Sequence, residues 1–178
     1  YTAGIFRPSL GDFFLTYSNR PPSENAPLRT DGRFKFGRGD DLPFAIDPDG
    51  DGLHTVGIFR VENGFMFIAA APVRDTPIAT EFEFPLPDRQ DGDIYMPVVG
   101  DWDGDGRDGV GVMRVRNGRV TFFLKNALDD SPIDYTLSSN FNFGPQAIGV
   151  AGDWDGDGID TVGVFQPAAR LFTLEDQA

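Results

Sequence analysis

Hydrophobic and polar positions alternate in short runs along the chain, and residues that favour turns separate these runs. Phe82-Glu83-Phe84, for example, places two aromatic rings on one side of an extended segment and a carboxylate on the other. The same alternation recurs at Phe34-Lys35-Phe36 and at Phe141-Asn142-Phe143. A period of two residues is typical of a half-buried β-strand, whereas long runs with the period of an amphipathic helix are missing. The pattern therefore predicts an all-β fold.

The strongest regularity is an internal repeat. The segments DPDGDGLHTVGIFRV from Asp47, DWDGDGRDGVGVMRV from Asp101 and DWDGDGIDTVGVFQP from Asp153 align without gaps, and their first residues lie 54 and 52 positions apart. In addition, TAGIFRP from Thr2 matches TVGIFRV from Thr55. We therefore expect residues 1–178 to form a single repeat domain. Its units are residues 1–46 (lacking an acidic loop), 47–100, 101–152 and, in part, 153–178.

Each unit contains signals for four short strands. The first strand of a unit is apolar and follows the acidic loop, the second is aromatic, the third is the alternating triplet, and the fourth leads into the next acidic loop. First strands are expected at Gly4–Phe6, Val56–Phe59, Val110–Met113 and Val162–Phe165, and second strands at Asp12–Tyr17, Phe65–Ala69, Val120–Leu124 and Leu171–Leu174. Fourth strands are expected at Leu42–Ile46, Met96–Val99 and Ala147–Ala151.

Four strands in about 53 residues is the pattern of a β-propeller blade. The sequence thus predicts a β-propeller-like array of 14 strands, or about three and a half blades. An incomplete blade leaves unpaired strand edges, which proteins normally pair or cover. Three ways of completing it remain open: pairing of the two ends within the chain, association of two copies, and head-to-tail addition that produces a filament.

The acidic loops carry the strongest chemical signal, the pattern D-x-D-G-D-G-x-D. Carboxylates at alternate positions of a tight loop converge on one point, and a glycine at the sixth position permits the sharp turn. Oxygen ligands in this number suit Ca²⁺, to which the backbone carbonyl of the seventh position adds a ligand. The candidate calcium ligands are Asp101, Asp103, Asp105, Arg107 (carbonyl) and Asp108 in one loop, and Asp153, Asp155, Asp157, Ile159 (carbonyl) and Asp160 in the next.

The loop formed by Asp47, Asp49 and Asp51, with the Leu53 carbonyl, is a third candidate calcium site. It carries His54 where the other two loops carry an aspartate, so we expect it to bind more weakly. The alternative for all three loops is an Asp-Gly turn without a metal. Mutual repulsion of the clustered carboxylates favours a bound cation over this alternative.

An acidic loop followed by an apolar strand resembles the FG-GAP and VCBS repeats, which are the calcium-binding blades of integrin α-subunit-like propellers and of many secreted bacterial proteins. The resemblance covers nearly the whole chain and implies an extracellular, calcium-stabilised scaffold. The family usually places its last acid at the ninth loop position, which is Thr55, Gly109 or Thr161 here, whereas this chain has its acid at the eighth. The likeness is closer to the bacterial variant GDWDGDGxDTVGV.

Composition narrows the function further. The 28 acidic and 15 basic residues give a formal charge of −13, which argues against nucleic acid and anionic membranes as partners. No apolar run approaches the length of a membrane span, so no membrane insertion is expected. The chain has no cysteine and a single histidine, and it lacks the sequence motifs of a nucleophile elbow, a P-loop or a zinc protease. We therefore expect no enzymatic activity.

The primary expectation is a secreted or cell-surface structural or adhesive protein that associates with other copies through its incomplete blade, or with another extracellular protein. One alternative is a calcium-dependent, lectin-like propeller, in which Trp102 and Trp154 of the acidic loops stack on a glycan. Another is an accessory module of a larger secreted enzyme. An arginine after the first strand recurs as Arg7, Arg60 and Arg114, and we expect it to brace neighbouring strands or loops.

Overall fold

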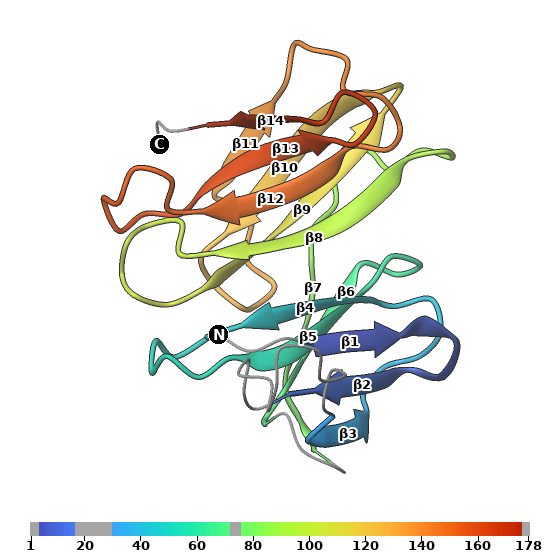
Figure 1. Cartoon of the computed structure of the whole chain (residues 1–178), viewed down its shortest axis with the longest axis vertical. Coiled ribbons are helices and arrows are strands. Elements are labelled where there is room, and N and C mark those ends of the chain that lie inside the picture. The colour runs from blue at the N-terminus through green and yellow to red at the C-terminus, as the bar shows by residue number, and fades with distance from the viewer. Residues whose placement is uncertain (1–3, 17–29, 72–75, 176–178) are drawn as a thin grey trace, which may run out of the picture.

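The fold is all-β, as the alternating pattern predicts. The computed structural model describes residues 4–16, 30–71 and 76–175, and these contain 14 strands and one 3₁₀ turn, Pro8–Leu10. Every strand pairing is antiparallel, and the strands form four separate sheets (Figure 1). Within the described residues no helix is long and apolar enough to cross a membrane.

The four sheets follow one another in chain order. The first has the order β1 (Gly4–Arg7), β2 (Asp12–Leu15), β3 (Gly32–Lys35), and the second β4 (Leu42–Ile46), β5 (Thr55–Arg60), β6 (Phe65–Ala69), β7 (Ile78–Glu83). The third has the order β8 (Ile94–Gly100), β9 (Gly109–Arg116), β10 (Arg119–Lys125), β11 (Tyr135–Ser138), and the fourth β12 (Ile148–Gly152), β13 (Thr161–Gln166), β14 (Leu171–Leu174).

The sheets are out of phase with the sequence units. The last strand of one unit, such as β4, pairs with the first strand of the next unit, β5, so each complete sheet combines strands from two units. The 14 strands are therefore distributed as two four-stranded and two three-stranded sheets. Within the described residues, the first sheet has no strand equivalent to β4 before β1, and the fourth has no strand equivalent to β7 after β14.

The hydrophobic core lies between successive sheets. One cluster joins the first and second sheets through residues such as Phe13 and Ile58, and another joins the second and third through Phe59 and Val112. A further cluster joins the third and fourth sheets, for example through Phe122 and Val164. None of the three clusters joins the first sheet to the fourth, and the two lie at opposite ends of the molecule (Figure 1). Each interior sheet thus has two buried faces.

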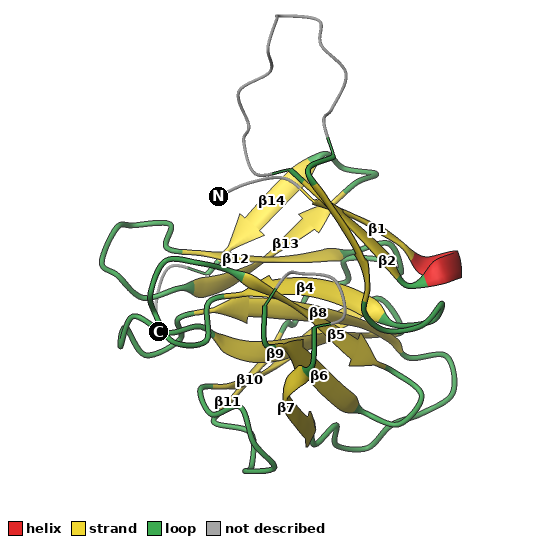
Figure 2. Ribbon diagram, turned by 90° about the horizontal axis from the view of Figure 1, so that it is seen from below, coloured by secondary structure: helices red, strands yellow, loops and turns green. Residues whose placement is uncertain are grey.

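We call the face of a sheet that is directed toward the preceding sheet its leading face, and the opposite face its trailing face. In the third sheet the leading face carries Val110, Val112 and Phe123, and the trailing face carries Met113, Phe122 and Leu124. A trailing face always packs on the leading face of the next sheet. Figure 2 shows the sheets from below, with the loops gathered at their ends.

The predicted third strand of the unit is wrong at Phe141-Asn142-Phe143. The outer strand β11 ends at Ser138, and Phe141 is exposed. Side chains satisfy the backbone locally here: the Phe141 N–H donates to Ser139 Oγ at 2.9 Å, and the Gly144 N–H donates to Asn142 Oδ1 at 2.9 Å. Such side-chain bonds compete with the strand ladder. In the other two triplets, by contrast, both phenylalanines are buried.

Candidate metal-binding loops

Three clusters of aspartates lie at equivalent places, in the loops between the inner strand and the next strand of the second, third and fourth sheets. In each cluster, carboxylate oxygens from the first, third and fifth loop positions lie within 4.8 Å of one another. The clusters are Asp47, Asp49 and Asp51; Asp101, Asp103 and Asp105; and Asp153, Asp155 and Asp157. The structure therefore brings together nine of the sequence-predicted ligands in three groups.

The first aspartate organises the loop around its own carboxylate. Asp101 accepts the Gly104 N–H at 2.8 Å on one oxygen and the Gly106 N–H at 2.8 Å on the other. Gly104 and Gly106 have φ angles of 73° and 87°, a left-handed conformation that glycine adopts without steric cost. The loops at Asp47 and Asp153 repeat these two hydrogen bonds. The glycines at the fourth and sixth positions are thus needed to turn the carboxylates inward.

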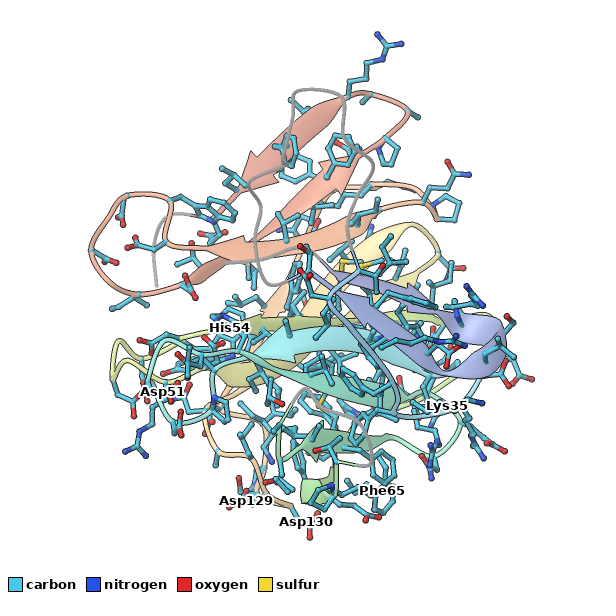
Figure 3. All side chains as sticks on the ribbon, turned by 60° about the horizontal axis from the view of Figure 1, so that its bottom comes forward. Lys35, Asp51, His54, Phe65, Asp129 and Asp130 are labelled. Carbon is cyan, nitrogen blue, oxygen red and sulfur yellow. The ribbon has the colours of Figure 1, made fainter. Side chains whose placement is uncertain are left out.

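Neighbouring loops are in contact. A Cβ atom on Gly50 would lie 2.5 Å from the Gly106 carbonyl oxygen, and one on Gly104 would lie 3.1 Å from Ile159 Cγ1. The fourth-position glycine of one loop therefore lies against the sixth or seventh position of the next. The three acidic clusters form a row along one end of the sheets. Figure 3 shows Asp51 and His54 at this end and Lys35 at the opposite end.

The eighth-position aspartates connect one loop to the preceding one. The Asp108 N–H donates to the Asp47 carbonyl at 2.9 Å, and Asp108 Oδ2 accepts the Asp47 N–H at 2.7 Å. Asp160 makes the same two bonds to Asp101, at 2.8 and 2.9 Å. Burial raises the pKa of the Asp108 carboxyl, and the hydrogen bond from Asp47 opposes this rise. Each carboxylate therefore contacts a candidate ligand residue of the neighbouring loop.

The seventh-position residues Leu53, Arg107 and Ile159 follow the clusters directly. Their N–H groups donate to the fifth-position aspartates at 2.7, 2.9 and 2.8 Å. Ligation by their carbonyls stays a prediction from the sequence, as does ligation by Asp108 and Asp160. His54 Nε2 lies 3.8 Å from Asp108 Oδ2, which places the histidine between the first and second clusters.

The donor set of each loop fits a hard divalent cation. It consists of carboxylate oxygens on a loop whose backbone N–H groups bind both oxygens of the first aspartate. The loop geometry is therefore preorganised around concentrated negative charge. Oxygen donors of this kind suit Ca²⁺, which tolerates flexible geometry. Nitrogen and sulfur donors, which softer transition metals favour, are absent from the three clusters.

The tryptophans of the acidic loops differ in their environments. Trp102 is buried in the cluster between the third and fourth sheets, where it packs against the core, and it is unavailable for stacking on a glycan. Trp154, at the same position of the following loop, is exposed. The indole rings of both cover the last glycine of the preceding inner strand, Gly100 or Gly152.

Several buried polar groups outside the loops were missed by the sequence reasoning. Asp41 forms a bidentate ion pair with Arg60, and Asp93 forms one with Arg116. Lys125 is buried, and its Nζ donates to two backbone carbonyls. Among the residues of these contacts, only Arg60 carried a sequence signal, because an arginine recurs at its position in the repeat. The prediction that the repeated arginine braces a loop is confirmed at Arg60.

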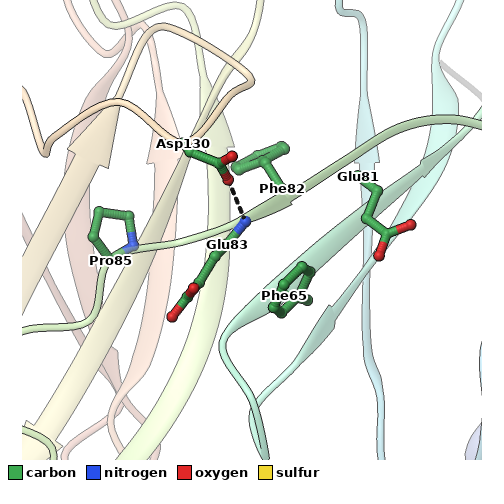
Figure 4. A pocket seen from close by; sticks show the side chains of 6 residues that line it. All are labelled: Phe65, Glu81, Phe82, Glu83, Pro85 and Asp130. Carbon is green, nitrogen blue, oxygen red and sulfur yellow. Dashed lines mark hydrogen bonds between the residues drawn. The ribbon is translucent and has the colours of Figure 1, made fainter.

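A shallow hollow of about 550 Å³ lies at the outer strand of the second sheet (Figure 4). Its lining includes Phe65, Glu81 and Glu83, and Asp130 closes one side by accepting the Glu83 N–H at 2.9 Å. The three carboxylates around it face solvent and do not form one of the three-carboxylate clusters. We assign no chemistry to this hollow.

Comparisons with protein-family models, with curated proteins and with solved structures found no match.

Proposed function

We propose that this protein is a calcium-stabilised structural repeat protein of the extracellular space, whose sheets are successive propeller-like blades and which associates with other copies. The observation that carries the proposal is the row of three equivalent carboxylate clusters, each in the loop that follows the inner strand of a sheet. The likeness of the loop motif to FG-GAP and VCBS repeats supports the same function. Millimolar calcium outside cells would fill sites of modest affinity.

Calcium acts structurally in this proposal. A bound ion removes the repulsion among three carboxylates, and it fixes the loop that connects the inner strand of a sheet to the next strand. Because the unfolded chain has no such arrangement of ligands, binding free energy adds to the free energy of folding. Full occupancy of the three loops would reduce the formal charge from −13 to −7.

Thermal unfolding in millimolar Ca²⁺, in Mg²⁺ and in excess EDTA tests the proposal. We expect Ca²⁺ to raise the unfolding midpoint well above its value in EDTA, and Mg²⁺ to raise it less. Asp103→Asn combined with Asp155→Asn should remove most of the calcium-dependent rise, whereas Asp91→Asn, at an exposed acid outside the clusters, should retain it. Equal midpoints in Ca²⁺ and EDTA would contradict the structural role of calcium.

A second candidate function is calcium-dependent glycan binding. It is favoured by one observation, the exposed indole of Trp154 beside the acidic cluster of the fourth sheet. Aromatic faces stack on sugar rings, and calcium can hold sugar hydroxyls. A glycan array probed with and without Ca²⁺ separates the two functions, because a purely structural protein should give no selective signal.

A further inference from the structure

The trailing face of the fourth sheet exposes positions that are buried in the other sheets. The strand registers make Phe172 equivalent to Phe122, because Gln166 faces Leu171 just as Arg114 faces Thr121. The exposed fraction of the side chain is 58% for Phe172 and 5% for Phe122. Leu174 is exposed in the same way, although its equivalents Leu124 and Ile68 are buried.

Other apolar side chains extend this face. Phe165 stacks on Phe172, with ring centroids 4.5 Å apart. Ile148 of the inner strand is exposed, as is Trp154, of which 40% is exposed compared with 5% of the equivalent Trp102. The fourth sheet thus carries one continuous apolar surface, which is equivalent to the surface of the third sheet that packs on the fourth. It is formed by Ile148, Trp154, Phe165, Phe172 and Leu174. We call this set the tail face.

The leading face of the first sheet shows the same contrast. Ile5 is 53% exposed, whereas Ile58, at the equivalent position of the second sheet, is 2% exposed. The guanidinium groups of Arg7 and Arg33 lie over the ring of Phe14, at 4.8 and 5.3 Å from its centroid. We call Ile5, Arg7, Phe14 and Arg33 the head face.

We propose that the tail face binds the head face of a second copy of this chain. All three internal contacts between sheets join a trailing face to a leading face, through equivalent positions. The tail face is equivalent to the trailing faces that pack on a leading face inside the chain. The head face is a leading face and can therefore pack on it. This inference rests on the self-association part of the proposed function, and it identifies the surfaces that carry it.

The charges on the head face suit this contact. The chain is strongly acidic, so two copies repel one another at long range. Arg7 places a cation at the surface that approaches the partner, whereas the guanidinium of Arg33 is paired with the buried carboxylate of Asp12, at 2.9 Å. At the internal contacts, the arginines equivalent to Arg7 reach the linker that precedes their own sheet: Arg60 binds Asp41, and Arg114 Nη1 donates to the Pro87 carbonyl at 3.0 Å.

The contact is heterologous, because the two surfaces that meet are different. Two copies joined by two such contacts close into a ring of eight sheets. Copies joined by one contact between each neighbouring pair grow into a longer array. Both arrangements depend on the same pair of faces. They differ from an isologous pairing of two tail faces, in which Ile5 would have no part.

Light scattering coupled to size-exclusion chromatography tests the proposal, with the full chain measured in Ca²⁺ and in EDTA. We expect the wild-type protein to have at least twice the mass of one chain. Ile5→Arg and Phe172→Arg should each reduce it to a single chain, because each places a charge in one of the two faces. The control is Ile78→Arg, at an exposed isoleucine on the outer strand of the second sheet, which should leave the mass unchanged.

Mixing the two variants tests head-to-tail geometry directly. Ile5→Arg retains its tail face and Phe172→Arg retains its head face, so an equimolar mixture should form a one-to-one complex from two single chains. A wild-type protein of single-chain mass would overturn the proposal, and so would an Ile5→Arg variant of unchanged mass. The calcium proposal and this contact can fail separately. A dimer that persists in EDTA would support the contact, even if calcium left the unfolding midpoint unchanged and thereby contradicted the calcium proposal.

Discussion

The carboxylate of Asp108 accepts a hydrogen bond from the backbone N–H of Asp47, at 2.7 Å, although the two residues lie 61 positions apart along the chain. The reverse bond, from the Asp108 N–H to the Asp47 carbonyl, closes the pair at 2.9 Å. An aspartate that stands beside one candidate metal loop therefore supports the first ligand residue of another. Asp160 and Asp101 repeat the arrangement one sheet later.

Asp108→Ala should destabilise the fold, because it leaves the Asp47 N–H without its acceptor. We expect a loss of about 1–3 kcal/mol in the free energy of unfolding, the usual result of leaving a buried donor unsatisfied. Urea denaturation measures this loss. Asp91→Ala, at an exposed turn, is the control and should change stability by less than about 0.5 kcal/mol. Equal stabilities for the two variants would show that the bond between loops contributes nothing.

Arg60→Ala should be among the most damaging single substitutions. Asp41 is buried, and both of its carboxylate oxygens accept hydrogen bonds from Arg60, each at 2.9 Å. Removing the arginine leaves a buried charge without its partner, which costs about 3–5 kcal/mol. Chemical denaturation of the variant measures this cost.

The chain provides a matched control for this substitution in Arg38→Ala. The guanidinium of Arg38 pairs with the exposed carboxylate of Glu62, and exposed pairs contribute about 0–1 kcal/mol. The difference between the two variants isolates the effect of burial. A loss at Arg38 that matches the loss at Arg60 would refute this account.

The two lysines of the chain should differ sharply in reactivity. Lys125 is buried, and its Nζ donates to the carbonyls of Asp129 and Ser131, both at 2.6 Å. Burial lowers the pKa of Lys125, but the closed environment shields the amine from reagents. Lys35 is exposed. An amine-reactive ester should therefore modify Lys35 in the native protein and Lys125 only after unfolding, as peptide mass spectrometry would reveal. Equal labelling of both lysines would contradict the burial of Lys125.

The ion pair of Asp93 with Arg116 should contribute a dependence of stability on acidic pH. Hydrogen bonds from Arg116, at 2.8 and 2.7 Å, hold the pKa of Asp93 well below its usual range. Because the folded pKa lies below the unfolded one, the unfolded chain takes up this proton first as pH falls. The stabilisation is therefore complete at neutral pH and is lost progressively below about pH 4.

Asp93→Asn checks this effect. The stability difference between wild type and variant should be largest near neutral pH and should shrink as pH falls through the acidic range. Urea unfolding at several pH values measures it, with Asp91→Asn as a control whose difference from wild type should stay small throughout. A difference for Asp93→Asn that is independent of pH would mean that the charge of Asp93 is not what stabilises the pair.

The sequence predicted most of the strands because each carries its own local signal. β6 was predicted at Phe65–Ala69 and β14 at Leu171–Leu174, since apolar runs between turn residues identify strands without knowledge of their partners. Local pattern does not reveal which strands pair. The pairing of β4 with β5 across a unit boundary is a tertiary property, and so is the distribution of strands among sheets.

The same reasoning explains the error in the third unit. Phe141-Asn142-Phe143 has the alternation of a strand, but Ser139 and Asn142 bond to the backbone nearby and end the ladder. Among the candidate metal ligands, the clustering of Asp101, Asp103 and Asp105 follows from their spacing within one loop. The attachment of Asp160 to Asp101 depends on how sheets stack, and no spacing within a single loop encodes it.

Since every complete sheet takes its inner strand from the preceding unit, the choice of where a unit starts has no structural meaning. A duplication that copies one repeat length of the gene, whatever its first codon, would add one sheet with its inner strand, acidic loop and bond between loops in place. A deletion of the same length would remove one sheet as cleanly. The architecture can therefore change its length in whole steps by recombination at arbitrary points, with no need for matched breakpoints.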